Sequence, residues 1–122
     1  MAYGTLQTDV INSSTGIFST NNAYSGIAKA WVQWVGSTAT INSSFNVSSV
    51  TRNAAGDFTI NFTTAMANAN YAIAGICSYA GGINEQTNSP TRTTSAIRVY
   101  TPQTTNGLPT DYANNSLIVL SS

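Results

Sequence analysis

The sequence predicts an all-β protein, either an antiparallel β-sandwich or a jelly-roll-like barrel, with about seven to eight short strands and an extended N-terminal arm. Two observations predict this fold class. Apolar and polar residues alternate along several short segments, as in strands with one buried face, and helical periodicity is absent. Clusters of glycine, asparagine, serine and proline separate these segments and are typical of turns.

The clearest strand pattern lies at residues 57–63. Phe58, Ile60 and Phe62 alternate there with polar residues, which predicts one buried face and one solvent-facing face that carries Asp57. The small residues 53–56 before it permit a tight turn, so the preceding strand should form a hairpin with this one.

Similar patterns give the remaining strands and the domain organisation. The expected strands are residues 6–11, 27–35, 40–50, 57–63, 71–78, 96–100 and 117–120. Residues 12–24 are polar and show no alternation, so we expect residues 1–24 to form a first strand and an extended arm. Residues 25–122 should form a single β-sandwich domain, in which Gly81 and Gly82 make a turn.

The composition argues against charged partners. Charged residues make up only 7% of the chain, against roughly 25% in ordinary globular proteins. Four basic and four acidic residues balance to a net charge of zero, so we expect neither nucleic-acid binding nor attraction to an anionic membrane. So little charge protects a monomer poorly from association. Permanent assembly into something larger is therefore expected.

No residue pattern indicates catalysis, a cofactor or a metal. The chain has no histidine, which excludes histidine-based triads and metal sites, and the single Cys77 is expected to pack as a small hydrophobic residue. The remaining alternative is a polysaccharide depolymerase, which would need two carboxylates within about ten ångströms of each other in a cleft. Its candidates are scattered along the chain: Asp9, Asp57, Glu85 and Asp111.

Two apolar motifs are candidate interfaces with another subunit or partner protein. Trp31 and Trp34 lie three residues apart, so in a strand they fall on opposite faces, and one of them must face solvent or a neighbouring chain. The segment Leu117, Ile118, Val119, Leu120 is apolar on both faces. The core can cover one face of such a strand, and a second subunit would cover the other.

Exposed aromatic residues could also recognise a ligand. The candidates are Tyr79, which precedes the turn at residues 80–82, and Tyr100 and Tyr112, which lie beside and in the loop of residues 101–115. This loop and residues 84–94 are the two longest polar loops. Loops on a rigid scaffold often carry recognition, and aromatic rings can stack on sugars, so a host surface glycan is a candidate ligand.

The sequence also resembles a known module. Residues 28–36 (AKAWVQWVG) and 44–71 (SFNVSSVTRNAAGDFTINFTTAMANANY) are similar to a module found in tail fibres and other structural proteins of bacteriophages, especially those of marine bacteria and cyanobacteria. The elements in common are a Lys-Ala-Trp-Val lead, a Ser-Phe-Asn-Val-Ser-Ser strand, a Gly-Asp turn and an aromatic strand that ends in Asn-Phe-Thr.

This resemblance implies a non-enzymatic phage virion structural protein, assembled as a homotrimer. A short chain that begins with Met1 and lacks a long fibrous region suits a capsid decoration or cement protein, which binds the major capsid protein on the head surface and stabilises the shell. The alternative is a tail-fibre or receptor-binding tip module that recognises a host glycan or outer-membrane protein. With no signal peptide and no membrane span in the sequence, we expect synthesis in the host bacterial cytoplasm and a final location on the virion surface, on the capsid exterior or on the tail.

Overall fold

The computed structural model describes residues 4, 10–13, 16–19, 26–79, 81–86 and 92–121. This described part forms strands and no helices, which confirms the all-β prediction. Two antiparallel sheets of five and four strands make up the body, and they are not closed into a barrel. The architecture is therefore consistent with a β-sandwich, the first of the two predicted architectures.

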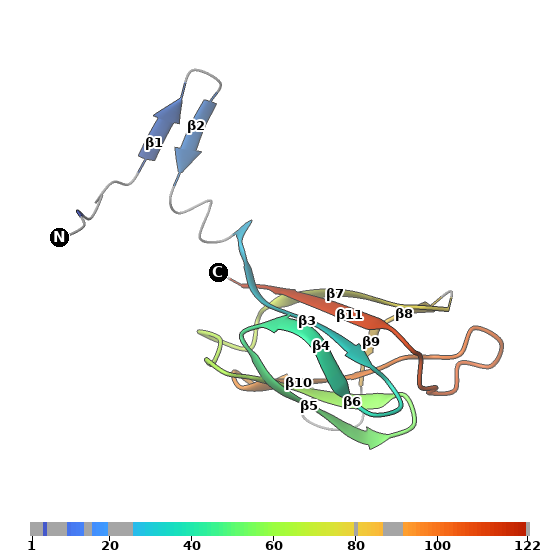
Figure 1. The fold of residues 1–122 in the computed structure, drawn as a ribbon. Helices are drawn as coiled ribbons and strands as arrows, with labels where there is room; N and C mark the ends of the chain where they lie inside the picture. The colour runs from blue at the N-terminus through green and yellow to red at the C-terminus, as the bar shows by residue number, and fades with distance from the viewer. Residues whose placement is uncertain are drawn as a thin grey trace.

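The five-stranded sheet has the order β4-β3-β11-β7-β8. Its members are β4 (Thr40–Phe45), β3 (Ala28–Val35), β11 (Asn115–Leu120), β7 (Ala72–Cys77) and β8 (Gly81–Gly82). The last strand of the chain, β11, lies in the centre of this sheet between β3 and β7 (Figure 1). The C-terminal strand thus joins β3 and β7, which lie far apart in the sequence.

The four-stranded sheet has the order β5-β6-β10-β9. Its members are β5 (Val47–Ala54), β6 (Asp57–Phe62), β10 (Ala96–Tyr100) and β9 (Asn84–Glu85). The predicted hairpin of β5 and β6 is present, and its turn includes Gly56 at a φ of 64°. A Cβ atom at Gly56 would lie 2.1 Å from the backbone nitrogen of Thr110, so the turn has room only for glycine.

The inward faces of the two sheets form one hydrophobic core. The indole of Trp34 on β3 meets the ring of Phe58 on β6 edge to face, with 5.5 Å between ring centroids. Phe58, Ile60 and Phe62 are all buried, as the alternation predicted. Asp57 is buried too, although the alternation placed it in solvent, because it accepts hydrogen bonds from Arg98 across the sheet.

One predicted strand is two strands in the structure. Residues 40–50 divide at Asn46, which has a φ of 55°, and the chain passes there from β4 in one sheet to β5 in the other. Asparagine tolerates this left-handed conformation better than most residues. The Asn46 side chain also stabilises the corner, because its amide donates to the carbonyls of Lys29 and Thr64 and its oxygen accepts from the Thr64 amide.

Two further predictions need correction. Residues 12–24 were expected to form an arm without strands, but β1 (Val10–Ser13) and β2 (Gly16–Ser19) pair antiparallel in a small sheet of their own. Gly81 and Gly82, predicted as a turn, form the edge strand β8. The first expected strand, residues 6–11, lies mostly outside the described residues, and the domain boundary after residue 24 stays a prediction.

Candidate functional site

The outer face of the five-stranded sheet is apolar, and its side chains are aligned by the strand register. Phe45 on β4 lies opposite Trp31 on β3, and Trp31 lies opposite Ile118 on β11. Ile118 in turn lies opposite Ala74 on β7. Residues directly opposite in antiparallel strands point to the same side of the sheet. A continuous apolar row therefore crosses four strands.

Large side chains on this face are open to solvent. Their exposed fractions are 39% for Trp31, 54% for Phe45, 69% for Ile76, 40% for Ile118 and 38% for Leu120. Single exposed hydrophobic residues are ordinary on protein surfaces, but a contiguous group marks an interaction site. We call these five residues, together with Gln33, Ala74 and Ser116 between them, the apolar face.

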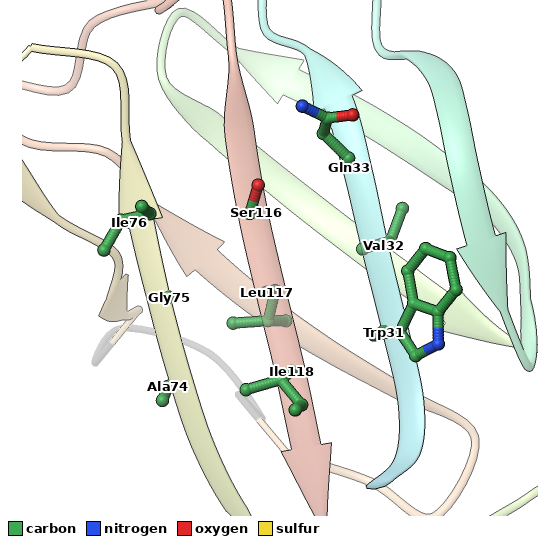
Figure 2. Close-up of a pocket in the computed structure, with 9 residues that line it drawn as sticks. All are labelled: Trp31, Val32, Gln33, Ala74, Gly75, Ile76, Ser116, Leu117 and Ile118. Atoms are coloured by element: carbon green, nitrogen blue, oxygen red, sulfur yellow. The ribbon is translucent and has the colours of Figure 1, made fainter.

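A shallow groove of about 480 Å³ runs over the centre of the apolar face. Figure 2 shows its lining on three adjacent strands: Trp31, Val32 and Gln33 on β3, Ser116, Leu117 and Ile118 on β11, and Ala74, Gly75 and Ile76 on β7. The groove exists because Ala74, Gly75 and Ser116 are small, so the sheet surface is low between the larger side chains. No charged side chain lines it.

The arginines of the described residues are paired with carboxylates away from the apolar face. Arg52 on β5 pairs with Asp111 at 2.6 Å, and Arg92 pairs with Glu85 on β9 at 2.7 Å. Arg98 on β10 pairs with Asp57 on β6 at 2.6 Å. These pairs involve the four-stranded sheet and the loops beside it, so the groove is left uncharged.

The pairs also shift the titration of two carboxyl groups. The Arg98 guanidinium, which donates two hydrogen bonds to Asp57, lowers the pKa of that carboxyl group against the opposing effect of burial. The Arg52 guanidinium lowers the pKa of Asp111 in the same way. Both groups are therefore held as carboxylates bonded to arginine, a structural role.

The outer face of the four-stranded sheet is polar. The Asn61 amide donates to the hydroxyl groups of Ser49 at 3.0 Å and Thr51 at 3.2 Å. The Asn53 amide donates to the Thr59 hydroxyl at 2.9 Å. We call Ser49, Thr51, Thr59, Asn61 and Arg98 the polar face. Its side chains form hydrogen bonds within a single chain, either to one another or to the neighbouring Asn53 and Asp57.

The six candidate interface residues fall on two different sides of the five-stranded sheet. Trp34, Leu117 and Val119 are buried in the core, so their side chains cannot contribute to an interface. Trp31, Ile118 and Leu120 lie on the apolar face. The prediction that the two tryptophans point to opposite sides is confirmed, because Trp34 is fully buried while Trp31 is exposed.

The three candidate recognition tyrosines are not brought together on one exposed surface. Tyr79 is 69% exposed and stacks on Tyr112, with 6.4 Å between ring centroids. Tyr112 itself is buried, and its hydroxyl donates to the Pro102 carbonyl. Tyr100 is half-buried on β10, where its hydroxyl accepts a hydrogen bond from Asn84. Of the three tyrosines, only Tyr79 has a solvent-exposed ring, and one side of that ring stacks on Tyr112.

Among the large side chains of the apolar face, sequence reasoning missed Phe45 and Ile76. Phe45 lies in a segment read as one continuous strand, and Ile76 lies in an apolar run from Tyr71 to Tyr79 in which no residue stood out. Alternation along each segment could have placed them on a face. Only the pairing of β4, β3, β11 and β7 shows that they share one face with Trp31.

The remaining reactive side chains have ordinary structural surroundings. Cys77 is buried, as predicted, and its thiol donates to the Gly81 carbonyl. Asp57, Glu85 and Asp111 each pair with a different arginine, while Asp9 lies outside the described residues. Within the described ranges, no three potential metal-ligating side chains cluster together.

Comparisons with known proteins give no relative. No protein-family model, no curated protein and no solved structure matches the chain. In the part of the chain that the structure describes, no helix is long and apolar enough to cross a membrane. The function must therefore be argued from the surfaces of the molecule.

Proposed function

We propose that the chain is a non-enzymatic structural protein of a phage virion, a capsid decoration protein that stabilises the shell. The observation that carries the proposal is the apolar face: five large apolar side chains on the outer face of one sheet, three of them aligned in a row, stay in water in the isolated chain. Covering this surface stabilises an assembly by roughly 25 cal/mol for each Å² removed from water.

The chemistry of the chain supports a structural role. It has no histidine to serve as a general base or metal ligand, and the carboxylates of Asp57, Glu85 and Asp111 are occupied by arginines. A glycosidase needs two carboxyl groups beside one cleft, whereas the groove on the apolar face is lined by no carboxylate. The phage context itself rests on the resemblance of residues 28–36 and 44–71 to virion modules.

The placement on the head, rather than the tail, is supported by the location of the exposed apolar surface. A subunit of an assembly on a shell needs a broad flat apolar surface for contact with its neighbouring subunits, and the apolar face is part of a sheet. A receptor-binding tip needs exposed aromatic residues on its loops. Of the three candidate tyrosines, two are partly or wholly covered.

A second candidate function, glycan recognition by a tail fibre tip, is favoured by one observation. The open ring of Tyr79 lies at a loop and is held in place by stacking on Tyr112. A fixed aromatic ring is a suitable platform for the apolar side of a sugar. Tyr79→Ala should then abolish binding to a host glycan while leaving the fold intact, because the ring is 69% exposed.

Antibody labelling of intact virions, viewed by electron microscopy, separates the two functions. Label distributed over the head supports the decoration protein. Label confined to the tail supports the fibre tip and directs attention to Tyr79. Virions that carry no label, from a lysate in which the protein is detected by immunoblot, would contradict both.

A further inference from the structure

We propose that the apolar face binds a second copy of this chain, so that two five-stranded sheets stack face to face about a twofold axis. This inference names the partner of the surface used above, and it rests on the proposed assembly role. Twofold pairing of one patch with itself is the commonest symmetry of soluble homo-oligomers. Face-to-face packing of sheets about 10 Å apart is also how the core of a sandwich forms.

The charge distribution favours self-pairing. The groove is lined by no charged side chain, Lys29 lies outside the groove beside Phe45, and the arginines of the described residues pair with carboxylates on the other sheet and its loops. The grooves of two copies can therefore approach each other without like-charge repulsion. A charged partner would instead lose the hydration of its charges against a surface that offers no opposite charge.

The shape of the apolar face also suits self-pairing. On one side of the face, Trp31 and Phe45 form a ridge across β3 and β4. On the other side, the groove runs over the small residues Ala74, Gly75 and Ser116 of β7 and β11 (Figure 2). A twofold rotation about an axis near Ile118 brings the ridge of each copy over the groove of the other. A ridge and a groove on the same face are what self-pairing requires.

Hydrogen bonding within the groove is also compatible with self-pairing. Gln33 and Ser116 lie directly opposite each other on β3 and β11, and they are the polar residues that line the groove. A glutamine amide both donates and accepts, and so does a serine hydroxyl. Either can therefore bond to a polar group of an identical chain, so the polar groups do not have to be buried unpaired.

The exposed area of the apolar face is large enough for a dimer interface. From their exposed fractions, the five large side chains offer on the order of 400 Å² of apolar surface per copy. A standard interface buries about 800 Å² per partner, so these residues alone supply about half of it. The small and polar residues of the face and its rim supply the rest. The result is a dimer of moderate affinity, and not the trimer that the resemblance implies, because one patch that pairs with itself closes after two copies.

The test is sedimentation velocity of the full purified chain from about 1 to about 100 µM, which spans the affinities expected of moderate interfaces. We expect a monomer–dimer equilibrium. Ile118→Asp places a charge in the centre of the interface and should raise the dissociation constant about 100-fold or more. The matched control is Ser49→Asp, which adds the same charge to the polar face and should leave the dimer intact.

Tryptophan fluorescence measures the solvent accessibility of the apolar face without introducing a charge. Trp31 is exposed and Trp34 is buried, so acrylamide should quench Trp31 at low protein concentration and lose access to it as dimers form. In Trp31→Phe, only the buried Trp34 emits, and quenching should not depend on protein concentration. Far-UV circular dichroism checks that each variant is folded, and Ile118→Thr replaces Ile118→Asp if the latter is not.

The outcomes distinguish this inference from the proposed function. A monomer at every concentration, a trimer, or a dimer unaffected by substitution of Ile118 would overturn the twofold pairing. A monomer that still labels virions would show that a virion protein covers the face, which leaves the proposed function standing. A dimer that labels no virion would retain the pairing and overturn the function.

Discussion

The two outer faces of the sandwich differ in how their side chains are satisfied. On the polar face, Asn61 bonds to Ser49 and Thr51, so the surface of the four-stranded sheet is complete within one chain. On the apolar face, Trp31, Phe45 and Ile118 lie in a row, with substantial parts of their side chains in water. The outer side chains of one sheet are therefore satisfied within the folded chain, whereas the other sheet keeps large apolar side chains in water, on the face that we propose binds a second copy.

The largest expected effect contrasts the same side chain on the inside and the outside of the sandwich. Phe62 is buried against Tyr71 with 5.8 Å between ring centroids, whereas Phe45 is 54% exposed on the apolar face. Phe62→Ala should lower the free energy of unfolding by about 3 to 5 kcal/mol, because it leaves a cavity in the core. Phe45→Ala should cost less than about 1 kcal/mol in the monomer. Urea denaturation of both variants at low protein concentration is the measurement, and equal losses would contradict the division into faces.

The next largest effect is the loss of folding stability at low pH. Because arginines lower the pKa of Asp57 and Asp111 in the folded state, the unfolded chain binds their protons more readily. The stability that these groups contribute is present above their unfolded pKa of about 3.9 and is lost as the pH falls below it, through the lower folded values. Urea midpoints measured from neutral pH down to about pH 2 should decline steeply in this window. Asp57→Asn should reduce stability at neutral pH and flatten the decline, and an unchanged acid slope would show that this pair is not formed.

A smaller effect tests whether the polar face is satisfied internally. Asn61→Ala removes two side-chain hydrogen bonds from the outer surface of β6, so it should cost about 0.5 to 1.5 kcal/mol. Thermal and urea denaturation measure this loss. No change in the sedimentation behaviour is expected, because the residue lies on the opposite sheet from the apolar face. A change in association state would mean that the polar face also meets a partner.

The smallest effect on folding should come from the centre of the apolar face. Ile118→Thr keeps a β-branched side chain that suits a strand, so unfolding of the monomer should change by about 0.5 kcal/mol or less. Its solubility should rise, because the apolar row is interrupted. Precipitation by ammonium sulfate, compared with the wild-type chain, measures this. A large loss of stability would place Ile118 in the core instead of at the surface.

The sequence alone determined much of the fold. Alternation identified β6 and the burial of Phe58, Ile60 and Phe62, because the side-chain period of a strand is a local property of the backbone. The spacing of Trp31 and Trp34 correctly predicted that they lie on opposite sides of a strand. The expected strand at residues 96–100 agrees with β10 (Ala96–Tyr100). These predictions needed no information about distant parts of the chain.

Only the tertiary structure decided which strand faces belong together. Sequence could not show that the C-terminal strand β11 lies between β3 and β7, so it could not align Ile118 with Trp31 and Ala74. Nor could it show that Asn46 turns the chain from one sheet into the other, or that Arg98 buries Asp57. The physical reason is the same in each case. Alternation within a strand fixes which side chains share a face of that strand, but the pairing of distant strands fixes which faces form the core and which form an exposed apolar surface.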